Sequence, residues 1–151
     1  MIVSQHLACF ITDLETERCT LQAFIELLKK EENALVQGKI EEIDYLASDK
    51  SRLIEKLIQL DEHRNEFLQN HGFSLERDSI VFGMSKQHSD QSKIQILWNE
   101  LLELAKIAQQ LNHSNGLIIS THLQHNQRAF AALHCAAGNV SLYGPKGQAY
   151  I

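Results

Sequence analysis

Apolar residues recur at helical spacing along most of this chain. In residues 3–36 a leucine returns every seven residues, beside further apolar residues three or four positions away. A heptad pattern sustained over more than four repeats predicts one long helix of a bundle or coiled coil. Gly38 follows the last apolar residues closely, as a left-handed helix stop would. The repeating leucines are Leu7, Leu14, Leu21, Leu28 and Leu35.

A second helix is predicted for residues 40–70, where apolar residues again step by three and four. Because only the residues around Gly38 separate the two segments, we expect them to fold back as an antiparallel hairpin. The apolar positions of this second stripe are Ile43, Leu46, Leu53, Leu57, Leu60 and Phe67.

Charged residues interrupt both stripes. Two glutamates, Glu17 and Glu31, stand in the first stripe, and two basic residues, Lys50 and Arg64, stand in the second. Long basic side chains can cover apolar surface while their charged ends reach water, so these breaks need not open the core. Pairing of opposite charges across the hairpin stays an open alternative, because the sequence does not fix the register.

A third long helix is predicted for residues 92–137, after a connector at 71–91 that has room for one short helix. Ser92 and Gln95 have the spacing of a capping box. The apolar stripe changes phase near Gly116, but one internal glycine costs only about 1 kcal/mol relative to alanine, so the helix should continue. Its C-terminal half therefore need not face the same partner as its N-terminal half.

Together these segments predict an all-α fold, an antiparallel bundle of three long helices made of a hairpin and a long C-terminal helix. We expect a single domain over residues 1–138. Residues 139–151 contain turn residues and little apolar material, so we expect a flexible tail there. The only proline is Pro145, which argues against a turn-rich β-sandwich or barrel.

Charge is unevenly distributed along the 151 residues, whose formal net charge is −5. All 19 acidic residues lie at or before Glu103, so the last third is weakly solvated and is a candidate for cover by a partner. An acidic chain gives no reason to expect nucleic-acid binding. Because the sequence has neither a membrane-spanning run nor a signal-peptide start, we expect a cytoplasmic protein.

Histidine and cysteine offer the only candidates for chemistry. His122 and His125 lie three residues apart, but no carboxylate follows Glu103 to complete a helical Glu-x-x-His metal pair, so we expect surface histidines, no metal and no cofactor. The three cysteines lack paired spacing, which favours free thiols. Catalytic motifs are missing, so we predict no enzyme. A histidine phosphotransfer bundle is a rival class, although the lysine typical of its histidine motif is absent.

Several motifs, taken in order, resemble the FlgN family of flagellar export chaperones. The resemblance spans nearly the whole chain. The residue after Gly38 departs from it, since Lys39 stands where an acidic residue is common. The matching segments are Glu31-Glu32-Asn33-Ala34-Leu35-Val36-Gln37-Gly38-Lys39, then Lys50 and Arg64, then Asn112-x-x-Asn115-Gly116-Leu117-Ile118, and Tyr143-Gly144-Pro145-Lys146-Gly147.

The resemblance implies a cytoplasmic, non-enzymatic chaperone that holds the hook-associated flagellar subunits FlgK and FlgL for type III export. It also implies that the C-terminal amphipathic region engages these clients. With the phase change at Gly116 and the loss of acidic charge, it places client binding between Asn115 and Tyr143. The expected client-binding residues are Asn115, Ile119, Leu123, Phe130, Leu133 and Tyr143.

Two alternatives stay open at this point. In the first alternative, the apolar stripe after Gly116 completes the intramolecular core instead of binding a client. In another, the chain is a structural coiled-coil adaptor that acts through oligomerisation. Self-association into a homodimer and contact with components of the export apparatus are compatible with either function.

Overall fold

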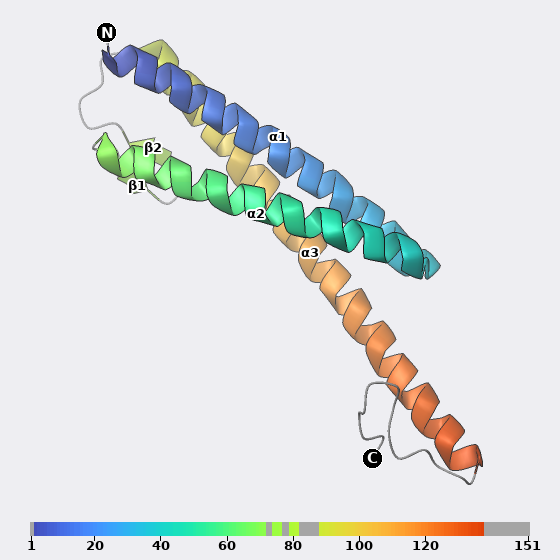
Figure 1. Cartoon of the computed structure of the whole chain (residues 1–151). Helices are drawn as coiled ribbons and strands as arrows, with labels where there is room; N and C mark the ends of the chain where they lie inside the picture. The colour runs from blue at the N-terminus through green and yellow to red at the C-terminus, as the bar shows by residue number, and fades with distance from the viewer. Residues whose placement is uncertain (1, 72–73, 77–78, 82–87, 138–151) are drawn as a thin grey trace.

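Three long helices make up most of the part of the chain that the structure describes. The computed structural model describes residues 2–71, 74–76, 79–81 and 88–137, with side chains described over 5–71 and 92–133. Helix α1 spans Ile2–Gln37, α2 spans Ile40–Asn70 and α3 spans His88–Ala137. Helices α1 and α2 form an antiparallel hairpin, and α3 runs alongside α1 in the same direction before it continues past the hairpin (Figure 1). The predicted all-α class with three long helices is confirmed.

The turn between α1 and α2 is a glycine-dependent helix stop, as the sequence predicted. Gly38 has a φ of +69°, in the left-handed region that side chains disfavour. Its N–H donates to the carbonyl of Leu35 at 3.3 Å, and the N–H of Lys39 donates to the carbonyl of Ala34 at 3.0 Å. This pair of bonds is a Schellman motif, which satisfies carbonyls that the helix end would leave unpaired. It reverses the chain within two residues.

The connector has room for one short helix by its sequence, but its described residues before α3 include two short strands instead. Strands β1, Ser74–Glu76, and β2, Ser79–Val81, pair antiparallel, with Leu75 opposite Ile80. The β-branched pair at 80 and 81 suits a strand better than a helix, which accounts for β2. The start of α3 was also misplaced: α3 begins at His88, so Ser92 lies in its second turn and is not a cap. Residues 139–151, predicted as a flexible tail, lie outside the described residues.

The core follows the heptad positions of α1. Helix α1 lies against both α2 and α3, so its leucine stripe is shared between two partners. Each fully buried leucine contributes roughly 1.5–3 kcal/mol relative to an exposed one. The largest side chains with almost no exposure are Leu7, Phe10, Leu14 and Leu28 of α1, and Ile94 and Asn115 of α3.

Helix α3 leaves the core at Asn115 and continues through Gly116 without a break, as predicted. After Asn115, every residue up to 133 is exposed except Ile118, which is half-buried. We call residues 116–137 the arm. The arm projects beyond the end of the hairpin where α1 and α2 are joined (Figure 1).

Candidate functional site

Two ion pairs fix the register of the α1–α2 hairpin. The Nζ of Lys50 donates to both carboxylate oxygens of Glu31, at 3.1 and 3.3 Å, and Arg64 donates to the carboxylate of Glu17. The two glutamates are two heptads apart, as are the two basic residues, so one antiparallel register satisfies both pairs. The opposite-charge pairing that the sequence left open is present.

The Glu17–Arg64 pair lies among apolar side chains. The Arg64 guanidinium also bonds Asp61 and lies 5.0 Å from the ring centre of Trp98 on α3. Burial raises the pKa of the Glu17 carboxyl above its usual 4.5, and Arg64 offsets only part of this rise. The pair therefore specifies the register of the hairpin and ties it to α3, while the ionised Glu17 costs stability.

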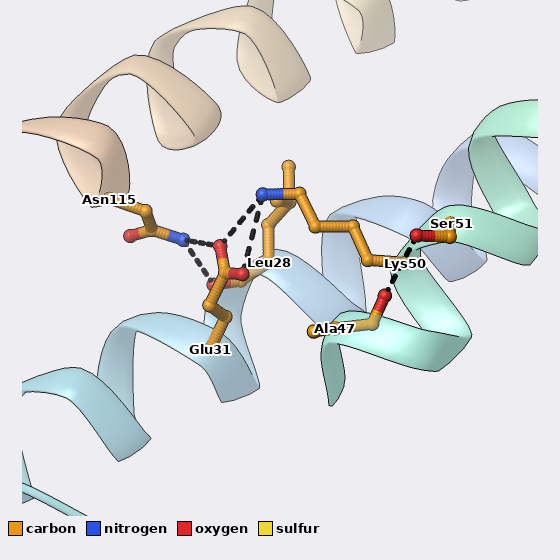
Figure 2. Close-up of polar contacts among 6 residues, drawn as sticks. All are labelled: Leu28, Glu31, Ala47, Lys50, Ser51 and Asn115. Atoms are coloured by element: carbon orange, nitrogen blue, oxygen red, sulfur yellow. Dashed lines mark hydrogen bonds and ion pairs between the residues drawn. The ribbon is translucent and has the colours of Figure 1, made fainter. Parts of the chain in front are cut away.

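The Glu31–Lys50 pair is extended to the third helix by Asn115. The Asn115 Nδ2 donates to the Glu31 Oε1 and to the carbonyl of Leu28, both at 2.9 Å. Figure 2 shows Glu31 of α1 between Lys50 of α2 and Asn115 of α3. All three helices therefore meet at one buried carboxylate, which we call the Glu31 junction. The junction fixes α3 to the hairpin at the residue before the arm begins.

This placement corrects one predicted site residue. Asn115 was expected to contact a client, but its side chain is completely buried and bonded inside the bundle. A client cannot reach it while the bundle is folded. The sequence pattern assigned Asn115 to the site because this residue stands where the apolar stripe changes phase. A buried asparagine at the end of a core stripe produces the same change of phase, so the sequence does not distinguish the two.

The arm presents the other predicted contacts. Ile119, Leu123, Phe130 and Leu133 are 45, 57, 50 and 66% exposed, so this stripe does not complete the intramolecular core. Their spacing of four, seven and three residues keeps them on one side of the helix. A row of large exposed apolar side chains on a projecting helix indicates an interaction surface. The remaining predicted residue, Tyr143, lies outside the described residues.

The arm is also almost without charge. Arg128 is its only charged residue, and its polar positions are filled by Gln, Asn, Ser, Thr and His. His122 and His125 are exposed, as predicted for surface histidines. No group of three or more metal-ligating side chains occurs within the described residues. In the same part of the chain, no helix is both long and apolar enough to cross a membrane.

One feature that the sequence did not predict is a groove between α2 and α3. Its volume is about 410 Å³, and eight of its eleven lining residues are apolar. Helical periodicity identifies which side of a helix is apolar, but not how far apart two helices lie on a third. The lining residues are Glu17 and Leu21 of α1, Ile54, Leu57, Ile58, Asp61 and Arg64 of α2, and Trp98, Leu101, Leu102 and Ala105 of α3.

The fold and the arm thus define an all-helical bundle that presents a long, exposed amphipathic helix. Comparison of the sequence with known proteins identifies the family to which the chain belongs. Residues 1–151 match the family described as FlgN protein, and the chain belongs to the FlgN family. No solved structure matches the chain at a significant level.

Curated relatives agree over most of the chain. The chain is 28% identical to the flagella synthesis protein FlgN of Yersinia enterocolitica serotype O:8 / biotype 1B over 140 residues, which cover 91% of this chain and 87% of that protein. It is 27% identical to the flagella synthesis protein FlgN of Proteus mirabilis over 141 residues, covering 90% of this chain and 86% of that protein. The resemblance noted from the sequence motifs is therefore confirmed as family membership.

Proposed function

We propose that this protein is a cytoplasmic flagellar export chaperone without enzymatic activity. Its clients are hook-associated subunits of the FlgK and FlgL type, which it binds through the arm and keeps competent for type III export. Membership of the FlgN family supports the flagellar role, because curated relatives are named flagella synthesis proteins. The observation that carries the site is the exposed apolar stripe of the arm.

The arm suits a helical or partly unfolded client. An amphipathic helix whose apolar residues recur at spacings of three, four and seven binds a groove or a second helix along that row. Ile119, Leu123 and Phe130 follow this spacing. Because the arm offers little charge, binding would depend on burial of apolar area, and a client chain end would become ordered on binding at an entropic cost.

The Glu31 junction gives the arm a fixed base. Helix α3 is continuous through residue 116, and the side chain of Asn115 is held by two hydrogen bonds to α1. A binding helix whose orientation is set in advance loses less entropy on association than a freely hinged one. We therefore assign Asn115 a positioning role and leave client contact to the exposed stripe.

Purification of the untagged chain with candidate subunits tests this function. Light scattering of the chain mixed with a FlgK-type or FlgL-type subunit should reveal a complex of defined stoichiometry. Co-purification from a flagellated host should yield the same subunits, identified by mass. A chain that forms only large homo-oligomers and captures no flagellar subunit would instead support the coiled-coil adaptor.

A further inference from the structure

Two histidines meet at the end of the hairpin that lies away from the arm. His6 lies in the second turn of α1 and His71 caps the C-terminus of α2, so the antiparallel packing of these helices brings them together (Figure 1). The His6 Nδ1 lies 3.3 Å from the His71 Nε2, and the two ring centres are 4.9 Å apart. Both side chains are exposed, so an ion from solvent can reach the pair.

The imidazole of His71 is held in place by aromatic and backbone contacts. Its Nδ1 lies 2.9 Å from the carbonyl oxygen of Phe67, one helical turn earlier, and its ring stacks on the Phe67 ring with centres 4.1 Å apart. Phe67 stacks in turn on the buried Phe10 of α1, with ring centres 4.4 Å apart. Because a carbonyl oxygen only accepts, hydrogen bonding assigns the proton of the neutral His71 ring to Nδ1. The His71 Nε2 therefore offers a lone pair to His6.

The separation of the two nitrogens is that of two imidazoles bound to one transition-metal ion. Zinc binds imidazole nitrogens in tetrahedral geometry at about 2.0–2.1 Å, which puts two such nitrogens about 3.3–3.4 Å apart. The observed separation of 3.3 Å fits this geometry. A metal-binding histidine commonly donates its other ring N–H to a backbone carbonyl, which is the contact that His71 makes with Phe67.

We propose that His6 and His71 form a chelating site for a divalent transition-metal ion such as Zn²⁺. The protein ligands would be the His6 Nδ1 and the His71 Nε2, and water would complete the coordination. For His6 to bind through Nδ1, its proton moves to its own Nε2, a change of tautomer that releases no proton from the neutral ring. Imidazole ligands favour Zn²⁺, Cu²⁺ and Ni²⁺, whereas Mg²⁺ and Ca²⁺ prefer oxygen ligands.

A metal ion at this site would clip the start of α1 to the end of α2. An ion that binds only the folded chain stabilises the fold by mass action, so the site would be structural. The sequence argued against a metal at His122 and His125 of the arm, which lie on one helix. His6 and His71 are 65 residues apart, so no local spacing pattern brings them to notice.

Calorimetric titration of the untagged full chain with ZnCl₂, together with thermal melts, tests the proposal. The melting temperature should rise by roughly 3–6 °C when free Zn²⁺ is tenfold above its Kd. His6→Gln and His71→Gln should each weaken Zn²⁺ binding by about tenfold or more, because a single imidazole has lost its chelating partner. Loss of the hydrogen bond between the rings could lower the melting temperature without metal, so the deciding readout is the rise that Zn²⁺ causes.

Two control variants remove other ligands that Zn²⁺ could use. Cys9→Ser removes an exposed thiol of α1, and His122→Gln breaks the histidine pair of the arm. Both controls should keep the Zn²⁺ affinity and the rise in melting temperature.

Three results would overturn the site. These are Zn²⁺ binding by His6→Gln and His71→Gln as tight as that of the original chain, loss of binding in either control variant, and a melting temperature of the original chain that does not respond to Zn²⁺. Circular dichroism checks that each variant folds. Should His71→Gln fail to fold, His6→Gln alone decides, because it changes an exposed residue near the start of α1.

Discussion

The Asn115 Nδ2 donates a hydrogen bond to the Glu31 Oε1 at 2.9 Å, inside the bundle and one residue before the arm begins. The same Glu31 oxygen accepts a bond from the Nζ of Lys50. A buried carboxylate is costly unless it is paired and hydrogen-bonded, and here the partners come from two other helices. The relationship couples the stability of the hairpin to the attachment of α3.

The first prediction concerns Asn115. Asn115→Ala removes both donated hydrogen bonds, so the buried Glu31 carboxylate loses one of its donors. The free energy of unfolding should therefore fall by about 1–3 kcal/mol. Urea denaturation followed by circular dichroism measures this. Asn112→Ala, one helical turn earlier and exposed, is the control and should change little. Equal stability of the two variants would mean that the junction does not fix α3.

The second prediction concerns coupling within the Glu31 junction. Lys50→Met strands a buried carboxylate, which should cost up to about 3 kcal/mol. Glu31→Gln removes that charge, so the double variant should lose less stability than the sum of the two single variants. A double-mutant cycle by urea denaturation gives the coupling energy. Strict additivity would contradict the pairing.

The third prediction follows from Glu17. Because burial raises the pKa of this carboxyl above its usual 4.5, the folded chain holds the proton more tightly than the unfolded chain. The Glu17 contribution to the free energy of unfolding therefore falls as pH rises from 4.5 through the raised pKa. Glu17→Gln lacks this term, so its stability relative to the original chain should increase from about pH 4 to about pH 7.

Urea denaturation at several pH values measures that difference. Glu62→Gln, at an exposed position on α2, shows how loss of an ordinary surface carboxylate behaves. A stability difference for Glu17→Gln that moves the opposite way with pH would mean that Arg64 outweighs burial.

The fourth prediction contrasts two leucines that the heptad and stripe patterns treat alike. Leu21→Asp puts an unpaired charge in the core, so the melting temperature should drop severely or the chain should fail to fold. Leu123→Asp changes an exposed arm residue and should melt close to the original chain. Thermal melts followed by circular dichroism compare them. Equal melting temperatures would contradict the boundary between core and arm.

Much of this fold could be predicted from periodicity and turn chemistry. Leucines every seven residues marked α1, and Gly38 marked its end, because both signals are local. The arm stripe was also found, since its apolar spacing is a property of one helix. The two strands of the connector could not be predicted in this way. A three-residue strand such as Ser79–Val81 gives too short an alternating pattern to be distinguished from a short helix.

The role of Asn115 could not be predicted for a different reason. Its burial depends on Glu31, which lies 84 residues away in the sequence, and on how α3 sits against the hairpin. The α2/α3 groove depends likewise on the separation of two helices packed on a third. Such properties belong to packing and have no local signature in the sequence.

The central claim is that the exposed stripe of the arm binds the client, and Phe130 tests it most directly as the only aromatic residue of that stripe. Titration calorimetry should compare Phe130→Ala with Tyr45→Ala, an aromatic that is 77% exposed on α2, against a FlgK-type subunit. We expect Phe130→Ala to lose about 2 kcal/mol of binding free energy, roughly a thirtyfold weaker Kd, while circular dichroism shows an intact fold. Tyr45→Ala should bind normally. A Phe130→Ala chain that binds the subunit as tightly as the original chain would contradict the account.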